Sequence, residues 1–228
     1  MRDNQHTLKK KHIFSGKGLH SGKSVRMSVE PAPENFGIKF RRTDLGGHAI
    51  IDACVDYVTT TSRGTTLENG EVKISTLEHL MASLYGLHID NALISIDSQE
   101  VPILDGSALP YVTEFISGGI VEQQAERHYF TPESKILYRD PKSGSELVVM
   151  PDDEFNIDLM IDFNSKVLGN QYARLTPATD FASEIAPCRT FVFFHELEPL
   201  FRNNLIKGGD LDNAIVIVEH HVDQKELD

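Results

Sequence analysis

The sequence has 228 residues, which suits one large domain or two small ones with a buried core. Apolar residues make up 40% and charged residues 25%, ordinary values for a soluble globular protein. The formal net charge of −12 argues against bulk nucleic-acid binding, which needs a positive surface. No apolar run is long enough to span a membrane, and the two cysteines, Cys54 and Cys188, fit a reducing cytoplasm better than a disulfide framework.

Strands dominate the first third of the chain. They are expected at 7–14, 24–30 and 36–42, and several short strands within 44–73 form a small inserted sheet. The Gly-rich segment 15–23 joins the first two strands and is compatible with a phosphate-binding loop or a hairpin. A phosphate loop needs a helix N-terminus after it, whereas a strand follows here, so the hairpin is favoured.

The clearest predicted helix covers residues 76–85. Ser75 is a suitable N-cap, and Glu78, three positions later, completes a capping-box pattern. Apolar residues recur at helical spacing along one face, and Gly86 provides a C-terminal stop.

Beyond this helix we expect a strand at 89–97 and a second helix that begins after Ser107 and reaches Ile116. The polar, unpatterned segment 123–128 is the best domain boundary. The second half shows strands and almost no helix: strands at 129–139, 145–150, 155–163, 178–182 and 213–219, and one short helix at 197–203.

Glu78 and His79 are adjacent on the first helix. At 100° per residue, Glu78 falls on the flank of the apolar face and His79 nearly opposite its centre, beside small residues. From the residues alone, Glu78 is a capping residue or a base, and His79 is a solvated histidine or a metal ligand. The His-Glu-x-x-His pattern of zinc proteases is absent, so further ligands must come from elsewhere.

Eight short segments stand in one order along the chain: Gly18-Leu19-His20-Ser21-Gly22, Pro31-Ala32-Pro33, Gly37-Ile38-Lys39-Phe40-Arg41-Arg42-Thr43-Asp44, Ser75-Thr76-Leu77-Glu78-His79-Leu80, Ile89-Asp90-Asn91, Glu100-Val101-Pro102-Ile103-Leu104-Asp105-Gly106-Ser107-Ala108, Arg189-Thr190-Phe191 and Gly208-Gly209-Asp210. Together they resemble the UDP-3-O-acyl-N-acetylglucosamine deacetylase family. The resemblance runs from about Thr7 to the last residue.

The resemblance implies a zinc-dependent amide hydrolase. It would remove acetate from UDP-3-O-(3-hydroxyacyl)-N-acetylglucosamine, the committed step of lipid A (lipopolysaccharide) biosynthesis. By resemblance Glu78 is the general base, His79 a zinc ligand and Thr190 a donor to the tetrahedral oxyanion. Zinc lowers the pKa of its bound water, and a neighbouring carboxylate can accept the proton. Asp105 either supports catalysis or only shapes its Asp-Gly turn.

The substrate contacts follow from the same resemblance. Phe191 would pack against the sugar ring, and Leu19 and His20 lie in a loop like the family's active-site rim. Residues 191–228 resemble an inserted βαβ unit that lines a passage for the fatty-acyl chain. Candidates for this lining, which are equally well explained as core residues, are Phe193, Ile206, Ile215 and Ile217.

The family fold implies α+β architecture: two layered domains of mixed sheet and helices, with the helices sandwiched between the two sheets. We therefore expect an N-terminal α+β domain at 1–124, with the β insert at about 44–73, and a partial second α+β domain at 125–228. Within the second domain, the βαβ insert covers about 191–228.

The sequence departs from the family near its end. A His-Lys-x-x-Asp helix should supply two more zinc ligands, and a Ser-Gly-His motif the general acid, but neither is present. The segment 220–223, His-His-Val-Asp, has different spacing and is interpreted as a solvated turn. We expect a C-terminally truncated chain, an incomplete second domain, one zinc ligand and no activity alone. Residues 210–218 resemble members fused ahead of a 3-hydroxyacyl-carrier-protein dehydratase.

Two other functions remain open. One is a non-catalytic fragment or module that binds a nucleotide sugar or an acyl chain without turnover. The other is a cysteine hydrolase that uses Cys188. Pro187 precedes this cysteine, and no helix N-terminus or neighbouring histidine is evident to lower its pKa.

Overall fold

The computed structural model describes residues 3–46 and 48–220. These residues form a mixed α+β fold with several sheets and few helices, which confirms the predicted fold class. The chain divides into two compact units. The core unit contains Met1–Glu126 and Asp180–Asp228, and the hairpin unit contains Arg127–Thr179.

The predicted division into domains 1–124 and 125–228, with helices between two sheets, stays a prediction. The compact units group the chain from Asp180 onward with its first half. The two units are therefore described separately below.

A five-stranded sheet forms the centre of the core unit. Its order is β2-β3-β9-β4-β5, where the strands are β2 (His12–Lys17), β3 (Ser24–Pro31), β9 (Ala92–Ile96), β4 (Ile38–Arg42) and β5 (Ala49–Asp52). Only β4 and β9 pair in parallel; the other neighbours are antiparallel. The predicted hairpin is confirmed, because β2 and β3 pair down to Lys17 opposite Ser24.

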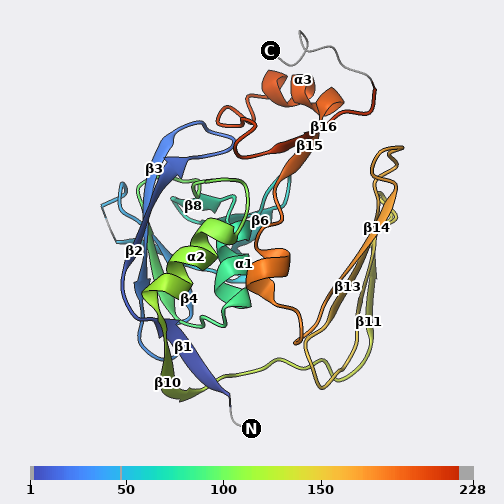
Figure 1. Cartoon of the computed structure of the whole chain (residues 1–228). Coiled ribbons are helices and arrows are strands. Elements are labelled where there is room, and N and C mark those ends of the chain that lie inside the picture. Colours follow the sequence, from blue (N-terminus) through green and yellow to red (C-terminus); the bar gives the residue numbers. More distant parts are fainter. Residues whose placement is uncertain (1–2, 47, 221–228) are drawn as a thin grey trace. The chain divides into compact units, whose positions relative to one another are not determined.

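Two helices, α1 (Glu78–Gly86) and α2 (Leu109–Gly118), cover one face of this sheet (Figure 1). Leu80 and Leu84 of α1 and Phe115 of α2 are buried in one cluster with the apolar strand residues. Burial of this apolar surface is the main stabilising contribution to the unit.

The predicted capping box at the start of α1 is wrong. Ser75 is the last residue of strand β8 (Val72–Ser75), and it makes no side-chain cap on the helix. Thr76 follows with a φ of 57°, so the chain turns sharply before the helix begins at Glu78. The Glu78 carboxylate instead accepts the backbone N–H of Thr65.

Particular residues set where α1 ends and where α2 begins. Gly86 is the last residue of α1, and a Cβ there would lie 2.3 Å from the ring of Phe181. Glycine at this position therefore permits close packing rather than a left-handed stop, and His88 is the residue with positive φ, at 58°. The predicted cap of the second helix is displaced by one residue: Ala108 is the N-cap of α2 and makes no side-chain cap, while the Oγ of Ser107 accepts the N–H of Leu109 at 3.1 Å.

The chain start pairs with a strand that the sequence did not predict. The predicted strand at 7–14 is interrupted, so that β1 (Asn4–Leu8) leaves the main sheet and pairs with β10 (Ile120–Glu126). Strand β10 occupies much of the segment predicted as a domain boundary. The sequence did not predict this strand because the residues that hold β10 in place are polar.

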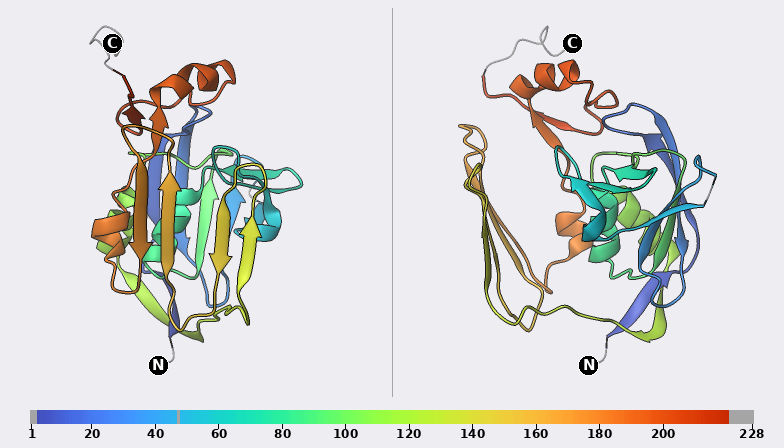
Figure 2. Two further views of the ribbon diagram at one scale, coloured as in Figure 1. Left: turned by 90° about the vertical axis from the view of Figure 1, so that its right-hand side faces the viewer. Right: turned by 180° about the vertical axis from the view of Figure 1, so that it is seen from behind.

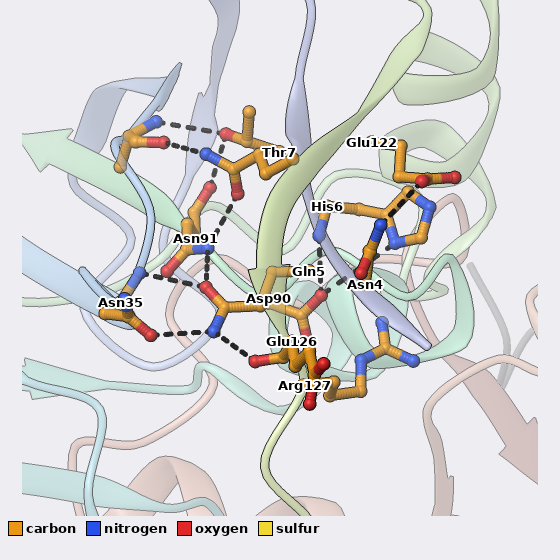
Figure 3. Close-up of polar contacts among 12 residues, drawn as sticks. Asn4, Gln5, His6, Thr7, Asn35, Asp90, Asn91, Glu122, Glu126 and Arg127 are labelled. Atoms are coloured by element: carbon orange, nitrogen blue, oxygen red, sulfur yellow. Dashed lines mark hydrogen bonds and ion pairs between the residues drawn. The ribbon is translucent and has the colours of Figure 1, made fainter. Parts of the chain in front are cut away.

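A buried polar network holds this pair (Figure 3). Asn91, which is 1% exposed, donates from Nδ2 to Gln5 and to Gln123, both at 2.8 Å. The Gln5 amide also donates to Asn35 at 2.8 Å, and Asn91 accepts the N–H of Gly37 at 2.8 Å. Because every buried amide here has partners, the network can take the place of an apolar contact.

The predicted β insert is a three-stranded sheet. Its order is β6-β7-β8, with β6 (Val58–Thr60) and β7 (Thr66–Asn69) beside β8, and a short 3₁₀ turn at Val55–Tyr57 precedes it. Strand β5 pairs with β4 of the main sheet instead.

The last described part of the core unit is a βαβ unit (Figure 2). Strands β15 (Phe191–Phe193) and β16 (Ile215–Ile217) pair in parallel and flank α3 (Phe194–Arg202). The predicted strand at 178–182 is wrong, since Phe181–Ile185 is a π-helical turn. Asp180 starts that turn by accepting the N–H of Ala182 at 3.2 Å, a local cap that competes with strand pairing.

The hairpin unit consists of two antiparallel hairpins. Strands β11 (Ile136–Arg139) and β12 (Glu146–Val149) form one, and β13 (Ile157–Asp162) and β14 (Asn170–Leu175) form the other. The sequence did not predict β14, which is mostly polar. In the described chain as a whole, no helix combines the length and apolar character needed to cross a membrane.

Candidate active site

The first turn of α1 brings Glu78 and His79 to the βαβ unit. His79 is half-buried, and its Nε2 lies 3.1 Å from Oγ1 of Thr190, the residue just before β15. Thr190 is fixed in turn by its N–H, which donates to the carbonyl of Gly106 at 2.7 Å. Two predicted site residues that are 111 positions apart in sequence, His79 and Thr190, are therefore neighbours in the core unit, and Glu78 directly precedes His79.

The environment of His79 favours its neutral form. Burial lowers the pKa of the imidazole below its ordinary value, while the negative charges of Glu78 and Asp105 act in the opposite direction. A neutral imidazole keeps one nitrogen lone pair, which is the form that binds a metal.

The Glu78 carboxylate is exposed next to His79. It is held by the N–H of Thr65, in a loop where Gly64 has a φ of +157°. One backbone donor thus orients the carboxylate, which remains open to solvent. A base for a water molecule needs this combination of fixed position and access.

Asp105 acts on His79 through its charge, and its own contacts are local. Its Oδ1 accepts the N–H of Ser107 at 3.0 Å and the Ser107 hydroxyl at 2.8 Å. Its backbone carbonyl accepts Nε of Arg189 at 2.9 Å. The residue therefore shapes the turn before α2, anchors the approach to Thr190 and places a negative charge near His79.

An apolar cavity of about 230 Å³ opens beside Thr190. Five of the predicted site residues line it, namely Leu19, His20, Thr190, Phe191 and Ile206. The other lining residues are mostly apolar and come from β15, α3, β16 and the segment between α3 and β16: Val192, Leu197, Leu200, Phe201, Gly209, Asp210, Leu211, Ala214 and Val216, with Arg63 from the loop before β7.

Three predicted lining candidates lie elsewhere. The Phe193 ring stacks on His195 with 5.4 Å between ring centroids, and it is not part of the cavity wall. On β16 the wall residue is Val216, not Ile215 or Ile217. Alternation along a strand sends neighbouring side chains to opposite faces, and the sequence alone did not fix which face meets the cavity.

Arg63 was not predicted as a site residue. This residue has a φ of 57°, and its carbonyl lies 3.2 Å from Nε2 of His20. Its guanidinium pairs with Glu196 of α3 at 2.5 Å, and this pairing lowers the pKa of the Glu196 carboxyl. An isolated arginine in a Ser-Arg-Gly turn carries no signal that predicts such a contact.

The fit to a zinc ion is incomplete. Within 3–46 and 48–220 there is no group of three His, Cys, Asp or Glu side chains arranged to hold a metal ion. A catalytic zinc site has three protein ligands, and the described residues offer His79 alone at this position. Of the predicted turn at 220–223, residues 221–223 lie outside the described residues.

Neither cysteine has the surroundings of a nucleophile. Cys54 and Cys188 are both exposed and free. The Cys188 thiol faces the carbonyl of Glu184 at 3.7 Å, and across the described chain no histidine is hydrogen-bonded to it. A cysteine hydrolase needs a base within hydrogen-bond distance of its thiol.

Comparison with known proteins gives one consistent family. A family model described as "LpxC: UDP-3-O-acyl N-acetylglycosamine deacetylase" matches residues 5–227. A "Bifunctional enzyme LpxC/FabZ" from Porphyromonas gingivalis is 51% identical over 98% of this chain and 48% of its own length. The enzyme of the same name from Bacteroides thetaiotaomicron is 48% identical over 98% of this chain and 49% of its own.

A relative with a shorter chain matches the same region. The "UDP-3-O-acyl-N-acetylglucosamine deacetylase" of Teredinibacter turnerae is 40% identical over 96% of this chain and 72% of its own length. The chain thus spans about half the length of the bifunctional relatives and nearly three quarters of this one.

Proposed function

The chain belongs to the UDP-3-O-acyl N-acetylglycosamine deacetylase family, and we propose that it serves the hydrolysis of the acetamide of UDP-3-O-(3-hydroxyacyl)-N-acetylglucosamine. The products are acetate and the free amine, in the committed step of lipid A (lipopolysaccharide) biosynthesis. The observation that carries the proposal is the contact of His79, which follows Glu78, with Thr190, which lines an apolar cavity.

In this proposal the side chains near His79 have distinct tasks. Glu78 accepts the proton of the attacking water, since its carboxylate is both oriented and exposed. The Thr190 hydroxyl donates a hydrogen bond to the oxyanion that develops on the acetamide oxygen. Asp105 acts through the charge that it places near His79 and through the turn that positions α2.

The cavity binds the sugar and the fatty-acyl chain of the substrate. Phe191 packs against the sugar, and Leu19 and His20 form the rim next to it. The apolar wall contributed by the βαβ unit, including Ile206, suits the fatty-acyl chain. Phe193 is in edge-to-face contact with the wall residue Phe191, with 6.0 Å between the ring centroids.

We further propose that His79 is one ligand of a zinc ion whose other ligands lie outside the described residues. Zinc would polarise the acetamide carbonyl and lower the pKa of the attacking water. Because one histidine does not complete such a site, we expect the 228-residue chain by itself to bind zinc weakly and to release no acetate.

A second role applies to the chain by itself. The apolar cavity is formed entirely by described residues, whereas the metal site is not. The 228-residue chain is therefore proposed to retain binding of the acyl group without turnover. A fatty-acid binding measurement on this chain, with Ile206→Glu as the control that places a charge in the cavity wall, tests that role.

The cellular setting is proposed on two grounds. Both cysteines are free and exposed, which suits a reducing cytoplasm. The bifunctional relatives from Porphyromonas gingivalis and Bacteroides thetaiotaomicron are 51% and 48% identical, and a third, from Chlorobaculum tepidum, is 39% identical, against 40% for the separate deacetylase of Teredinibacter turnerae. The identities of 51% and 48% support a fused 3-hydroxyacyl-carrier-protein dehydratase in the full-length protein.

The test is acetate release by this chain extended to the full length of its deacetylase relatives. Glu78→Gln should keep zinc and lose turnover by about 10²-fold or more, because it removes the base and spares the ligand. Glu68→Gln is the matched control, since Glu68 pairs with Lys73 on β7 and β8, outside the cavity. Unchanged turnover in Glu78→Gln, or an equal loss in Glu68→Gln, would contradict the proposal.

A further inference from the structure

One buried carboxylate lies between the two segments that carry the proposed site. Glu100 is 2% exposed and sits where its backbone bridges to Ser75, at the end of β8. Within the described residues, no lysine or arginine lies within ion-pair distance of it. A buried carboxylate of this kind depends on hydrogen bonds for its stability.

The hydrogen bonds of Glu100 come from two different segments. Its Oε1 accepts the N–H of His20 at 2.8 Å and its Oε2 accepts the N–H of Ser21 at 2.9 Å. Oε1 also accepts the Thr76 hydroxyl at 3.2 Å. The first two donors belong to the rim loop of the cavity, and the third lies two residues before Glu78.

Two features show that the surrounding chain is adapted to this carboxylate. A Cβ on Gly18 would lie 2.2 Å from Oε2 of Glu100, so only glycine allows the loop to approach this closely. Thr76 has a φ of 57°, a conformation that is strained for a β-branched residue. Its hydroxyl bond to Glu100 and its N–H bond to the carbonyl of Thr65, at 3.1 Å, hold it there.

The loop that Glu100 holds is also in contact with the βαβ unit. The carbonyl of Leu19 accepts the N–H of Gly208 at 3.0 Å, and the carbonyl of His20 accepts the N–H of Lys207 at 3.3 Å. Glu100 therefore fixes N–H groups on one side of this short loop while the carbonyls of the same loop define the position of the cavity wall. A shift of the loop would move the rim and the wall together.

We propose that Glu100 is a positioning residue for the proposed deacetylation, which sets the cavity rim at His20 relative to the start of α1 at Glu78 and His79. This positioning role rests on the proposed function, because Glu100 acts only through the rim and the start of α1. It assigns no contact with the substrate to Glu100 itself. Loss of the carboxylate releases the rim loop and relaxes Thr76, so the substrate is held less firmly while the side chains that react remain present.

The first test is amide hydrogen exchange on the 228-residue chain. Glutamine at position 100 has one carbonyl oxygen, so Glu100→Gln leaves one of the two amides of His20 and Ser21 without an acceptor, whereas Glu100→Ala deprives both. A hydrogen bond to a carboxylate is among the stronger hydrogen bonds in a protein, so exchange should rise roughly 10-fold or more at one amide in Glu100→Gln and at both in Glu100→Ala. The amides of β9 should not change.

The second test is steady-state kinetics on this chain extended to the full length of its deacetylase relatives. Glu100→Gln and Glu100→Ala should raise KM in that order, by roughly 10-fold in the alanine variant, with a smaller change in kcat and unchanged zinc content. Glu30→Gln is the matched control. It removes a partly buried carboxylate that pairs with Lys11 at 3.0 Å on the sheet, away from the cavity.

The outcomes separate this proposal from the proposed function. If the unaltered enzyme releases no acetate, the proposed function is wrong and the positioning role falls with it. If the enzyme is active and the Glu100 variants have the KM of Glu30→Gln, the positioning role alone is overturned. A uniform rise in exchange across β9 and the rim loop would also overturn it, because Glu100 would then only stabilise the fold.

Discussion

The core unit and the hairpin unit have the same kinds of strand but different surroundings. In the core unit, Met27, Val29, Ile94 and Ile96 of β3 and β9 are fully buried under α1 and α2. In the hairpin unit, every residue of β11, β12 and β13 is exposed. Apolar residues such as Ile157 and Leu159 therefore gain little from folding there. Strand sequences alone do not make a stable unit; the layer that covers them does.

The largest effect on the free energy of unfolding should come from shortening one isoleucine side chain to alanine in each unit. Ile94→Ala in β9 removes fully buried apolar volume and should lower the free energy of unfolding by roughly 2–5 kcal/mol. Ile157→Ala in β13 changes a side chain that is 44% exposed, and it should stay within about 0.5 kcal/mol. Urea denaturation followed by circular dichroism measures both. Equal losses would show that the hairpin unit has a core of its own.

The proposed chemistry places its effects in the core unit alone. Thr190→Ala should lower kcat by about 10²–10³-fold in the extended enzyme, because it removes an oxyanion donor. Thr176→Ala, in the hairpin unit, is the control and should leave kcat unchanged. Both variants should keep their melting temperature. A large drop in melting temperature with normal specific activity would make Thr190 a structural residue instead.

A smaller effect should appear in the pH dependence of the core unit. His12 is buried, and burial together with Lys10 lowers its pKa below the ordinary value of 6.5, against the opposing charge of Glu114. Below about pH 6.5, His12 takes up a proton more readily in the unfolded chain than in the folded chain. The free energy of unfolding should therefore fall as the pH falls below about 6.5. One such group contributes at most about 1.4 kcal/mol per pH unit.

His12→Leu should flatten this dependence between pH 7 and 5, where thermal melts measure it. His79 acts in the same direction and remains in the variant, so part of the dependence persists. The exposed histidine of α3, His195, gives the control His195→Leu, which should keep the full slope. If both variants keep the full slope, His12 does not carry it.

Much of the core unit was predictable because its elements follow apolar periodicity. The strands β4 and β9 lie within predicted segments, and α1, α2, β2 and β3 overlap predicted segments but run past their ends. Strand β10 was missed because amide hydrogen bonds to Gln5 and Asn91, not apolar burial, fix it. The predicted capping box is wrong because β8 ends at Ser75, and the turn at Thr76 separates this residue from the start of α1 at Glu78.

The candidate site was predictable only in part. The resemblance to the family pointed to Glu78, His79 and Thr190, and the structure places these residues together. Arg63 and Glu100 were not singled out, because their contacts depend on how distant loops meet. No local pattern around either residue shows which backbone groups will surround it.

The claim on which the account depends most is that His79 binds zinc. The direct measurement is zinc content, by mass spectrometry of the metal, in this chain extended to the full length of its deacetylase relatives. The account predicts about one zinc per chain in the unaltered protein and a small fraction of that in His79→Ala, because a catalytic site needs three protein ligands. Equal zinc content in the two proteins would contradict it.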